Sequence, residues 1–330
     1  MDALQSGSAM RFDVVKCHGS GNDFPLIDAR AIDLDDAGWA AVARALADRG
    51  GPIGGDGLLL LGAGRGGAAF AMRMFNPDGS EAETCLNGLR CVARMGFEAL
   101  GLERADVTLK TSVATVEHVA SLAPRVYTVR ETAGPASIDA AAWPLHGAPA
   151  RIVDAPIAAL PGTRRFTAIA MPNPHLVSFV DAIDDSELSA IGAVCEAAPD
   201  WLPNRANVSF VEPRGDDLFV RTFERGVGLT DSCGSAMGAS IYAAGLTGRV
   251  AFGRETTVFN RGGLVRAIAA ADGMVTLMGN ATIEWHGAVT VDLERGVASG
   301  LEIAARADDE VAAWLAAVGA STGRAPTILS

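Results

Sequence analysis

Apolar and polar residues follow one another in a pattern that predicts many short β-strands. Residues 11–16 (RFDVVK) alternate polar and apolar side chains, which is typical of a half-buried strand. Apolar runs of strand length recur further along the chain, bounded by glycine, proline or asparagine. These runs are LLLL at 58–61, FAMRMF at 70–75, FTAIAM at 166–171, HLVSFV at 175–180, NVSFVE at 207–212 and DLFVRTF at 217–223.

Helical spacing of apolar residues predicts helices at residues 36–48 and near 308–318. Residues 86–101 and 234–245 are apolar nearly all round, and a helix of that kind is usually buried on every side. Residues 17–24 (CHGSGNDF) read as a glycine-rich loop. Strands interspersed with a few helices predict a mixed α/β (α+β) fold.

Cys85 and Cys233 lie in matching sequence frames. Each frame reads R-x-F, nine further residues and the cysteine, and the frames begin at Arg73 and Arg221. Each predicts a strand, a polar loop and a thiol at the start of a helix. The repeat therefore predicts two similar, pseudo-symmetric domains with a cleft between them.

The composition changes at residues 131–150, which contain three prolines and many alanines. This change predicts an N-terminal half at residues 10–130 and a C-terminal half at residues 131–283. From residue 295 to residue 330 the chain is rich in alanine and carries no motif, so this tail is an extension whose role the sequence leaves open.

Charge and hydropathy exclude several classes of partner. The net charge is −12 and there is no basic run, which argues against binding to nucleic acid. No apolar stretch reaches the ~20 residues of a membrane-spanning helix, and no signal peptide opens the chain. We therefore expect a cytoplasmic protein with a small-molecule partner and no membrane partner.

The cysteine and lysine contents argue against the common cofactors. The chain has five cysteines and no C-x-x-C pair, which suits a reducing compartment and predicts neither disulfides nor a structural zinc site. Only Lys16 and Lys110 could form the Schiff base that pyridoxal phosphate needs. We expect no cofactor and no metal.

Two thiols at helix starts suit proton transfer at carbon. The positive end of a helix favours a thiolate and lowers the pKa of a thiol there, and the free backbone N–H groups can hold a carboxylate. One thiolate could remove an α-proton while the opposite thiol delivers a proton to the other face. The result would be inversion of an amino acid without a cofactor.

Six motifs in order give the chain a family resemblance from about Arg11 to Leu293. They are KCHGSGNDF (16–24), GGDGLL (54–59), FNPDGSEAETCLNGLRC (75–91), MPNPH (171–175), RANVSF (205–210) and ERGVGLTDSCGSA (224–236). The chain resembles the diaminopimelate epimerase family. The resemblance implies two similar halves, each a sheet wrapped around a central helix, with the active site in the cleft and residues 284–294 returning to the first half.

The resemblance also implies an activity: interconversion of LL- and meso-diaminopimelate by two cysteines, in lysine and peptidoglycan precursor synthesis. It allows a homodimer. Cys85 and Cys233 match the catalytic thiols, and Glu224 and Arg225 match the pair that reads the distal amino-acid end of the substrate. The remaining matched positions hold the α-carboxylate or surround the substrate: Leu86, Asn87, Gly234 and Ser235, then Asn22, Asn76, Asn173 and Asn207.

Two positions depart from the family pattern. Leu86 stands where the family usually has glycine, and Leu229 stands where it usually has glutamate. A racemase of another amino acid is therefore an alternative within the same superfamily. A thiol redox sensor and a non-catalytic amino-acid-binding protein are alternatives of other classes. Asp23 and Asp56 could simply cap loops.

Overall fold

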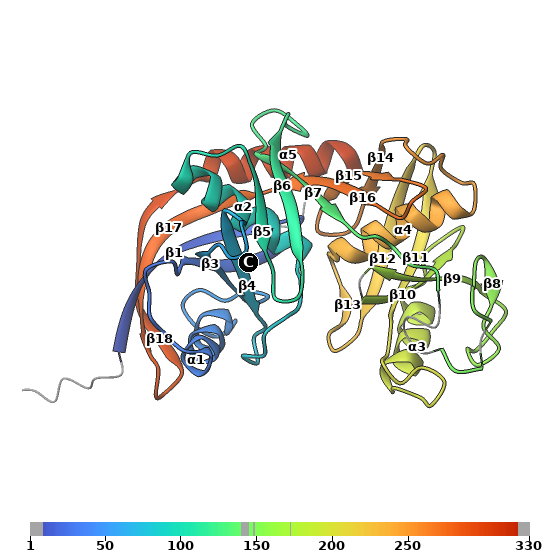
Figure 1. Ribbon diagram of the computed structural model, residues 1–330, viewed down its shortest axis with the longest axis horizontal. Coiled ribbons are helices and arrows are strands. Elements are labelled where there is room, and N and C mark those ends of the chain that lie inside the picture. Colours follow the sequence, from blue (N-terminus) through green and yellow to red (C-terminus); the bar gives the residue numbers. More distant parts are fainter. Residues whose placement is uncertain (1–8, 140–144, 148, 172, 323–330) are drawn as a thin grey trace, which may run out of the picture. The chain divides into compact units, whose positions relative to one another are not determined.

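The computed structural model describes residues 9–139, 145–147, 149–171 and 173–322, and the chain divides into two compact units (Figure 1). Unit 1 comprises Met1–Arg130 and Asn280–Ser330, and unit 2 comprises Glu131–Gly279. Unit 1 is therefore discontinuous in sequence. No helix in the described ranges combines the length and apolar character needed to cross a bilayer.

The elements of unit 1 are mostly strands. They are β1 (Ala9–Gly19), β2 (Asn22–Asp28), α1 (Asp36–Ala47), β3 (Leu58–Ala63), β4 (Phe70–Phe75), α2 (Leu86–Leu100), β5 (Arg104–Thr108), β6 (Val113–Val119), β17 (Thr282–Asp292), β18 (Val297–Arg306) and α5 (Asp308–Thr322). Strand β7 (Thr128–Ala133) crosses the boundary between the units.

Unit 2 has a similar inventory. Its elements are β8 (Ala155–Pro156), β9 (Arg165–Met171), β10 (Asn173–Phe179), α3 (Asp185–Glu196), β11 (Asn207–Arg214), β12 (Asp217–Glu224), β13 (Gly228–Thr230), α4 (Gly234–Leu246), β14 (Thr256–Phe259), β15 (Leu264–Ala269) and β16 (Val275–Asn280).

The two units repeat one strand-pairing scheme. From β1 through β6, successive neighbours pair antiparallel, parallel, antiparallel, parallel and antiparallel. The series β9, β10, β11, β12, β14 and β15 gives the same sequence of pairings. The prediction of a mixed α/β fold with two similar halves is confirmed.

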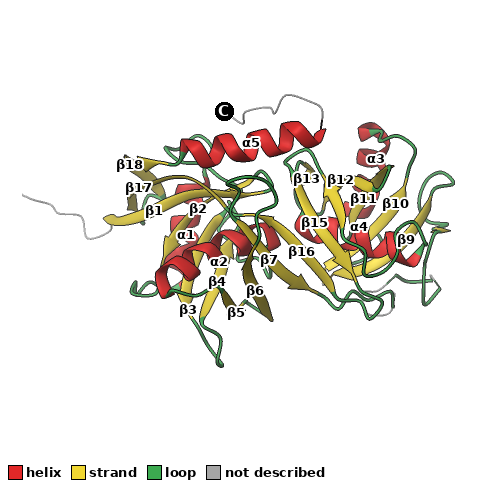
Figure 2. Cartoon of the chain, turned by 90° about the horizontal axis from the view of Figure 1, so that it is seen from above, coloured by secondary structure: helices red, strands yellow, loops and turns green. Residues whose placement is uncertain are grey.

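One helix in each unit lies inside the sheet. Helix α2 contacts every strand from β1 to β6, and α4 contacts the six corresponding strands of unit 2 (Figure 2). Leu89, Val92 and Phe97 of α2 are buried, as are Met237 and Ile241 of α4. The nearly all-round apolar pattern of both segments follows from this enclosure, because only the last turn of α2 is exposed to water.

The glycine-rich loop predicted at residues 17–24 is wrong in extent. Residues 17–19 complete β1 and residues 22–24 open β2, so only Ser20 and Gly21 form the connection. Both have positive φ, 53° and 85°, as a two-residue hairpin turn of the favoured hand requires. The hairpin places Asn22 at the very start of β2.

The alanine-rich tail forms part of unit 1. Strand β18 pairs antiparallel with β17, which pairs with β1 on its other side. Helix α5 packs on β17, where the Trp314 side chain is buried. Glu310 of α5 accepts two hydrogen bonds from Arg94 of α2, at 2.6 and 2.8 Å, so the tail is fixed to the central helix.

Candidate active site

Cys85 is the N-cap residue of α2. Its backbone is extended, with φ −149° and ψ 101°, and its sulfur accepts a hydrogen bond from the Gly88 N–H at 3.4 Å. The residue is half-buried. A sulfur in this position lies at the positive end of the helix, which favours its ionised form.

Cys233 holds the equivalent place in unit 2. It is the N-cap residue of α4, with φ −143° and ψ 107°, nearly the conformation of Cys85. Its sulfur lies 3.5 Å from the Ser235 hydroxyl oxygen, and the residue is buried. The duplicated frame in the sequence therefore corresponds to a duplicated local structure.

The surroundings of Cys233 oppose its ionisation. Burial raises the pKa of this thiol well above its ordinary value, and the negative charge of Glu224 raises it further. The Ser235 side chain and the Ala236 N–H act in the opposite direction. The helix start alone would lower the pKa of this thiol, so burial outweighs the helix and keeps Cys233 protonated at neutral pH.

Three of the predicted site residues meet in unit 1. The Asn22 Oδ1 atom accepts a hydrogen bond from Asn87 Nδ2 at 3.4 Å and another from the Cys85 sulfur at 3.9 Å. Asn87 is buried, and its own Oδ1 accepts from Arg90 Nη2 at 2.7 Å. The start of β2 and the first turn of α2 thus form one polar cluster around the thiol.

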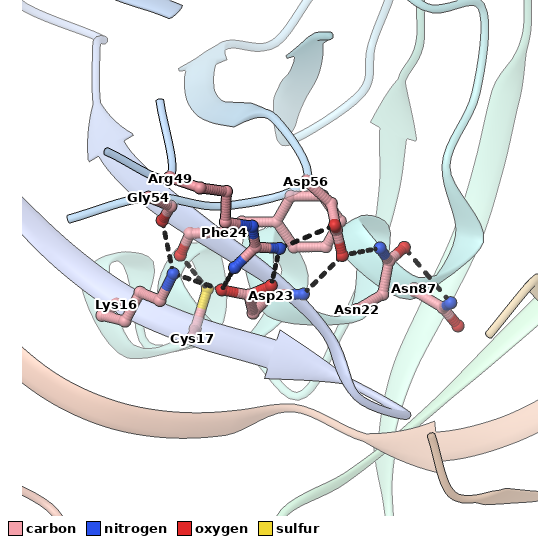
Figure 3. Close-up of polar contacts among 9 residues, drawn as sticks. All are labelled: Lys16, Cys17, Asn22, Asp23, Phe24, Arg49, Gly54, Asp56 and Asn87. Atoms are coloured by element: carbon pink, nitrogen blue, oxygen red, sulfur yellow. Dashed lines mark hydrogen bonds and ion pairs between the residues drawn. The ribbon is translucent and has the colours of Figure 1, made fainter. Parts of the chain in front are cut away.

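A network of charges lies behind Asn22 (Figure 3). Asp56 accepts hydrogen bonds from the Asn22 side chain and from Arg49 Nη2, the latter at 2.8 Å. Asp23 accepts from both guanidinium ends of Arg49, at 2.6 and 3.0 Å, and is also bound by Lys16. The sequence pattern assigned no role in the site to Lys16 or Arg49, and it allowed Asp23 and Asp56 simply to cap loops.

The two aspartates differ in acidity. Burial alone would raise the pKa of Asp23, but hydrogen bonds and charge from Arg49 and Lys16 bring it below its usual value. The pKa of Asp56 is raised, by burial first and then by the negative charge of Asp23. The groups that bind these two carboxyl groups are N–H donors, so both act as hydrogen-bond acceptors.

Two further predicted residues of unit 1 have local roles. The Asn76 side chain donates to Ser80 Oγ at 2.9 Å, and its backbone N–H donates to the Ser80 carbonyl at 2.8 Å. This is the turn-forming geometry expected of an asparagine in a loop. Leu86 is the first residue of α2 and is buried, so the side chain that replaces the family's glycine has found room in the protein.

The asparagines of unit 2 stand at strand starts. Asn173 opens β10, and its Oδ1 lies 3.0 Å from His175 Nε2, which donates to it. Burial lowers the pKa of His175 to about 3, so the ring is neutral. Asn207 opens β11, and its Oδ1 accepts from the Arg225 backbone N–H at 3.0 Å.

The predicted distal-end pair lies at the end of β12, with Glu224 its last residue and Arg225 the next. Glu224 Oε1 accepts from Thr230 Oγ1 at 2.7 Å, and Arg225 Nη1 donates to the Asn204 carbonyl at 3.2 Å. Leu229, which replaces the family's glutamate, packs against the hydrophobic core of unit 2. Gly234 and Ser235 are the first two residues of α4.

All five cysteines are free, and the described part of the chain has no group of three or more potential metal ligands.

Solved structures share this fold at low sequence identity. A hydroxyproline epimerase from Agrobacterium vitis gives a TM-score of 0.59 at 16% identity, covering 88% of this chain and 94% of that one. A PhzF-family phenazine biosynthesis protein from Bacillus anthracis gives 0.61 at 13%, covering 85% and 99%. The chain therefore falls in the fold class of two-domain proteins that these structures represent.

Sequence comparison is more specific. The model of the family described as diaminopimelate epimerase matches residues 14–122 and 167–284. A diaminopimelate epimerase from Enterococcus faecalis is 40% identical over 282 residues, 81% of this chain and 86% of the relative. Another from Clostridium acetobutylicum is 37% identical over 291 residues, 86% and 87% of the two chains. The chain belongs to the diaminopimelate epimerase family, and the resemblance of its motifs is confirmed.

Proposed function

We propose that this protein interconverts LL- and meso-diaminopimelate without a cofactor, as part of lysine and peptidoglycan precursor synthesis. The observation that carries the proposal is the matched position of Cys85 and Cys233, each the N-cap of an enclosed helix with nearly the same backbone angles. The relatives that bear the name diaminopimelate epimerase supply the substrate. A reducing cytoplasm would suit five free thiols.

The proposed reaction exchanges one proton for another. One cysteine, as thiolate, takes the proton from the substrate α-carbon, and the C–H electron pair stays on carbon. The other cysteine, as thiol, donates its proton to the opposite face, so the new C–H bond has inverted configuration. After one turnover the two sulfurs have exchanged protonation states, and the reverse reaction restores them.

The helix starts are suited to hold the reacting carboxylate. Free N–H groups in the first turn and the positive end of each helix attract an anion, and they stabilise the negative charge that develops next to it. We assign this role to the N–H groups of Leu86 and Asn87 at α2 and of Gly234 and Ser235 at α4. Asn22, Asn76, Asn173 and Asn207 would line the rest of the substrate.

The distal amino-acid head of diaminopimelate needs a cation and an anion. We assign its carboxylate to the guanidinium of Arg225, which can form two parallel hydrogen bonds to it, and its ammonium to Glu224. The backbone of Arg225 is held by Asn207, which fixes the root of this side chain. A substrate without the distal carboxylate would leave guanidinium donors unpaired.

Incubation in deuterated water without added cofactor tests the proposal. Diaminopimelate is expected to acquire deuterium at its α-carbon, and lysine, which lacks the distal carboxylate, at least roughly a hundredfold more slowly. Arg225→Ala should reduce this preference, whereas Arg214→Ala, at an exposed arginine paired with Glu212, should not. Faster exchange with lysine, histidine or glutamate would point to a racemase of another amino acid. Absence of exchange with every substrate would point to a binding protein or a redox sensor.

A further inference from the structure

The side-chain amide of Asn22 has three hydrogen-bond partners, one at its nitrogen and two at its oxygen. Its nitrogen donates to Asp56, and its oxygen accepts from Asn87 Nδ2 and from the Cys85 sulfur. An amide can meet these demands in only one of its two orientations. Which end of the amide faces the thiol is therefore determined at both ends, by Asp56 at the nitrogen and by Asn87 at the oxygen. The Asn87 amide is itself oriented by Arg90, which donates to its oxygen.

Asp56 is the partner that holds the nitrogen end. An ionised carboxylate accepts hydrogen bonds and donates none, so only the NH₂ end of Asn22 can face it. The same Asp56 oxygen also accepts from the Asp23 backbone N–H at 3.1 Å, which ties the carboxylate to the start of β2. With the nitrogen bound in this way, the carbonyl oxygen of Asn22 must point toward Cys85.

The Asp56 carboxylate itself belongs to a wider network of charged side chains. Arg49 bridges Asp23 and Asp56, and Lys16 binds both Asp23 and the Gly54 carbonyl, the latter at 2.6 Å (Figure 3). Glu284, on β17, is the further charged group close enough to Lys16, Asp23 and Arg49 for its own pKa to respond to them. Asp56 thus shares the Arg49 guanidinium with Asp23, and both of its oxygens accept from N–H donors.

We propose that Asp56 is a positioning residue that turns the Asn22 carbonyl oxygen toward Cys85 and so favours the protonated thiol at that position. The inference rests on the proposed acid/base role of Cys85. A carbonyl oxygen can accept from S–H but repels a thiolate, whereas an NH₂ group would stabilise the thiolate. The amide of Asn22 thus opposes the Gly88 N–H, which donates to the same sulfur.

The pH dependence of Cys85 alkylation by iodoacetamide in the free protein tests this directly. Trypsin cleavage after Arg73 and Arg90 releases Cys85 in a peptide without Cys91 or Cys233, so its modification can be followed alone. Asp56→Asn removes the obligatory acceptor at the nitrogen end and leaves only the longer hydrogen bond from Asn87, at 3.4 Å, to oppose a flip of the Asn22 amide. We expect the midpoint of Cys85 alkylation to fall by about one pH unit. Asn22→Ala, which deletes the acceptor altogether, should also lower it.

A double-mutant cycle separates orientation from simple charge. If Asp56 acts through Asn22, adding Asp56→Asn to Asn22→Ala changes the midpoint no further. The same fall in both backgrounds would show a through-space effect of the lost charge and would overturn the proposal, as would an unchanged or raised midpoint in Asp56→Asn. The control is Asp28→Asn, which removes another arginine-paired carboxylate from β2 and should leave the midpoint unchanged.

The alkylation experiment is independent of turnover. If wild-type protein exchanged no deuterium while the cycle gave the expected result, the proposed function would fail and the orientation of Asn22 by Asp56 would stand. If exchange occurred and the cycle gave additive shifts, the function would stand and the positioning role would fail. If Asp56→Asn does not fold, Asn22→Ala alone still tests the proposal, because it leaves the charge network intact. An alkylation midpoint that did not fall in this variant would show that the Asn22 oxygen does not favour the protonated thiol.

Discussion

Cys85 and Cys233 have the same backbone conformation but different neighbours. The sulfur of Cys85 lies among neutral amides, while Cys233 is buried near the Glu224 carboxylate. Equivalent positions at two helix starts therefore have different polar surroundings. The difference comes from the strands that face each thiol, because β2 supplies Asn22 and β12 supplies Glu224.

Replacing either thiol with a hydroxyl should abolish most of the activity. Cys85→Ser and Cys233→Ser are each expected to lose on the order of 10²-fold or more in epimerisation, because serine is a far weaker base at neutral pH. The rate of α-deuterium incorporation measures the loss. Cys195→Ala, at a buried thiol in the core of unit 2, serves as the control and should retain exchange. Near-normal turnover by either serine variant would contradict the two-base mechanism.

Part of the site could be predicted from sequence and part could not. Cys85, Asn22 and Asn87 were assigned from motifs, and the structure brings these three together. Lys16 and Arg49 carried no local signal, since their roles depend on how the 49–57 segment meets the β1–β2 hairpin. Such contacts are tertiary, and neither periodicity nor turn chemistry encodes them.

The arginine that opens the first frame ties together two elements of unit 1. Arg73, on β4, donates to Asp36, the first residue of α1, at 2.8 Å and to Glu81, in the loop before α2, at 2.7 Å. The loop that carries Cys85 is thereby fixed to a peripheral helix. The arginine of the R-x-F frame thus fixes the loop that carries the cysteine, and this role could not be predicted from the sequence pattern.

The arginine of the second frame repeats the arrangement in unit 2. Arg221, on β12, donates to Asp185, the first residue of α3, at 3.2 Å and to Asp231, just before Cys233, at 2.9 Å. Its side chain is only 6% exposed, compared with 29% for Arg73. The arginine of this ion pair is therefore shielded from water in unit 2 and partly exposed in unit 1.

This difference predicts unequal losses of stability. Arg221→Met should lower the free energy of unfolding by about 2 kcal/mol and Arg73→Met by about 1 kcal/mol, because exposed ion pairs contribute less. The partners Asp185 and Asp231 are themselves partly exposed, which limits the larger value. Urea denaturation measures both, with Arg214→Met as an exposed control. Equal losses would show that burial of the arginine does not decide the effect.

The enclosed helices and the strongly apolar strands follow from the sequence pattern, but α3 and several strands, among them β5, β6 and β18, were missed. Helix α3 is rich in small residues and buries only one face, so its periodicity is weak. Strand β18 is exposed at most positions and shows no alternation of apolar and polar residues. Its existence depends on the free edge of β17, to which it pairs. A strand formed by such pairing has little signal of its own.

Each unit contains one buried neutral histidine. Burial lowers the pKa of His18 to about 4 and that of His175 to about 3, against an ordinary value near 6.5. Between these values the unfolded chain binds protons that the folded protein does not. The contribution of these two histidines to the free energy of unfolding is therefore fully present above pH 6.5, and it is lost as the pH falls from 6.5 toward the pKa values in the folded protein.

Acidification should show the effect of both histidines on stability. At pH 5.5 each histidine is expected to lower the free energy of unfolding by about 1.4 kcal/mol relative to its value well above pH 6.5. His18→Gln and His175→Gln should each make the denaturation midpoint less sensitive to pH between 5 and 7. His286→Gln, at an exposed position, is the control. If both buried variants kept the wild-type pH slope, these rings would be charged inside the protein.

The pairing of β1 with β17 has a consequence for how the protein is made. Residues from Ala9 to His18 align with residues from Asp292 back to Thr282. Strand β1 is therefore synthesised long before β17, the strand with which it pairs. Unit 2 is continuous from Glu131 to Gly279 and is complete in the nascent chain before β17 has been synthesised. During that interval β1 can pair only with β2, and its other edge stays open to any strand that meets it. Vectorial synthesis thus favours the second half of the chain as the first to reach its native state.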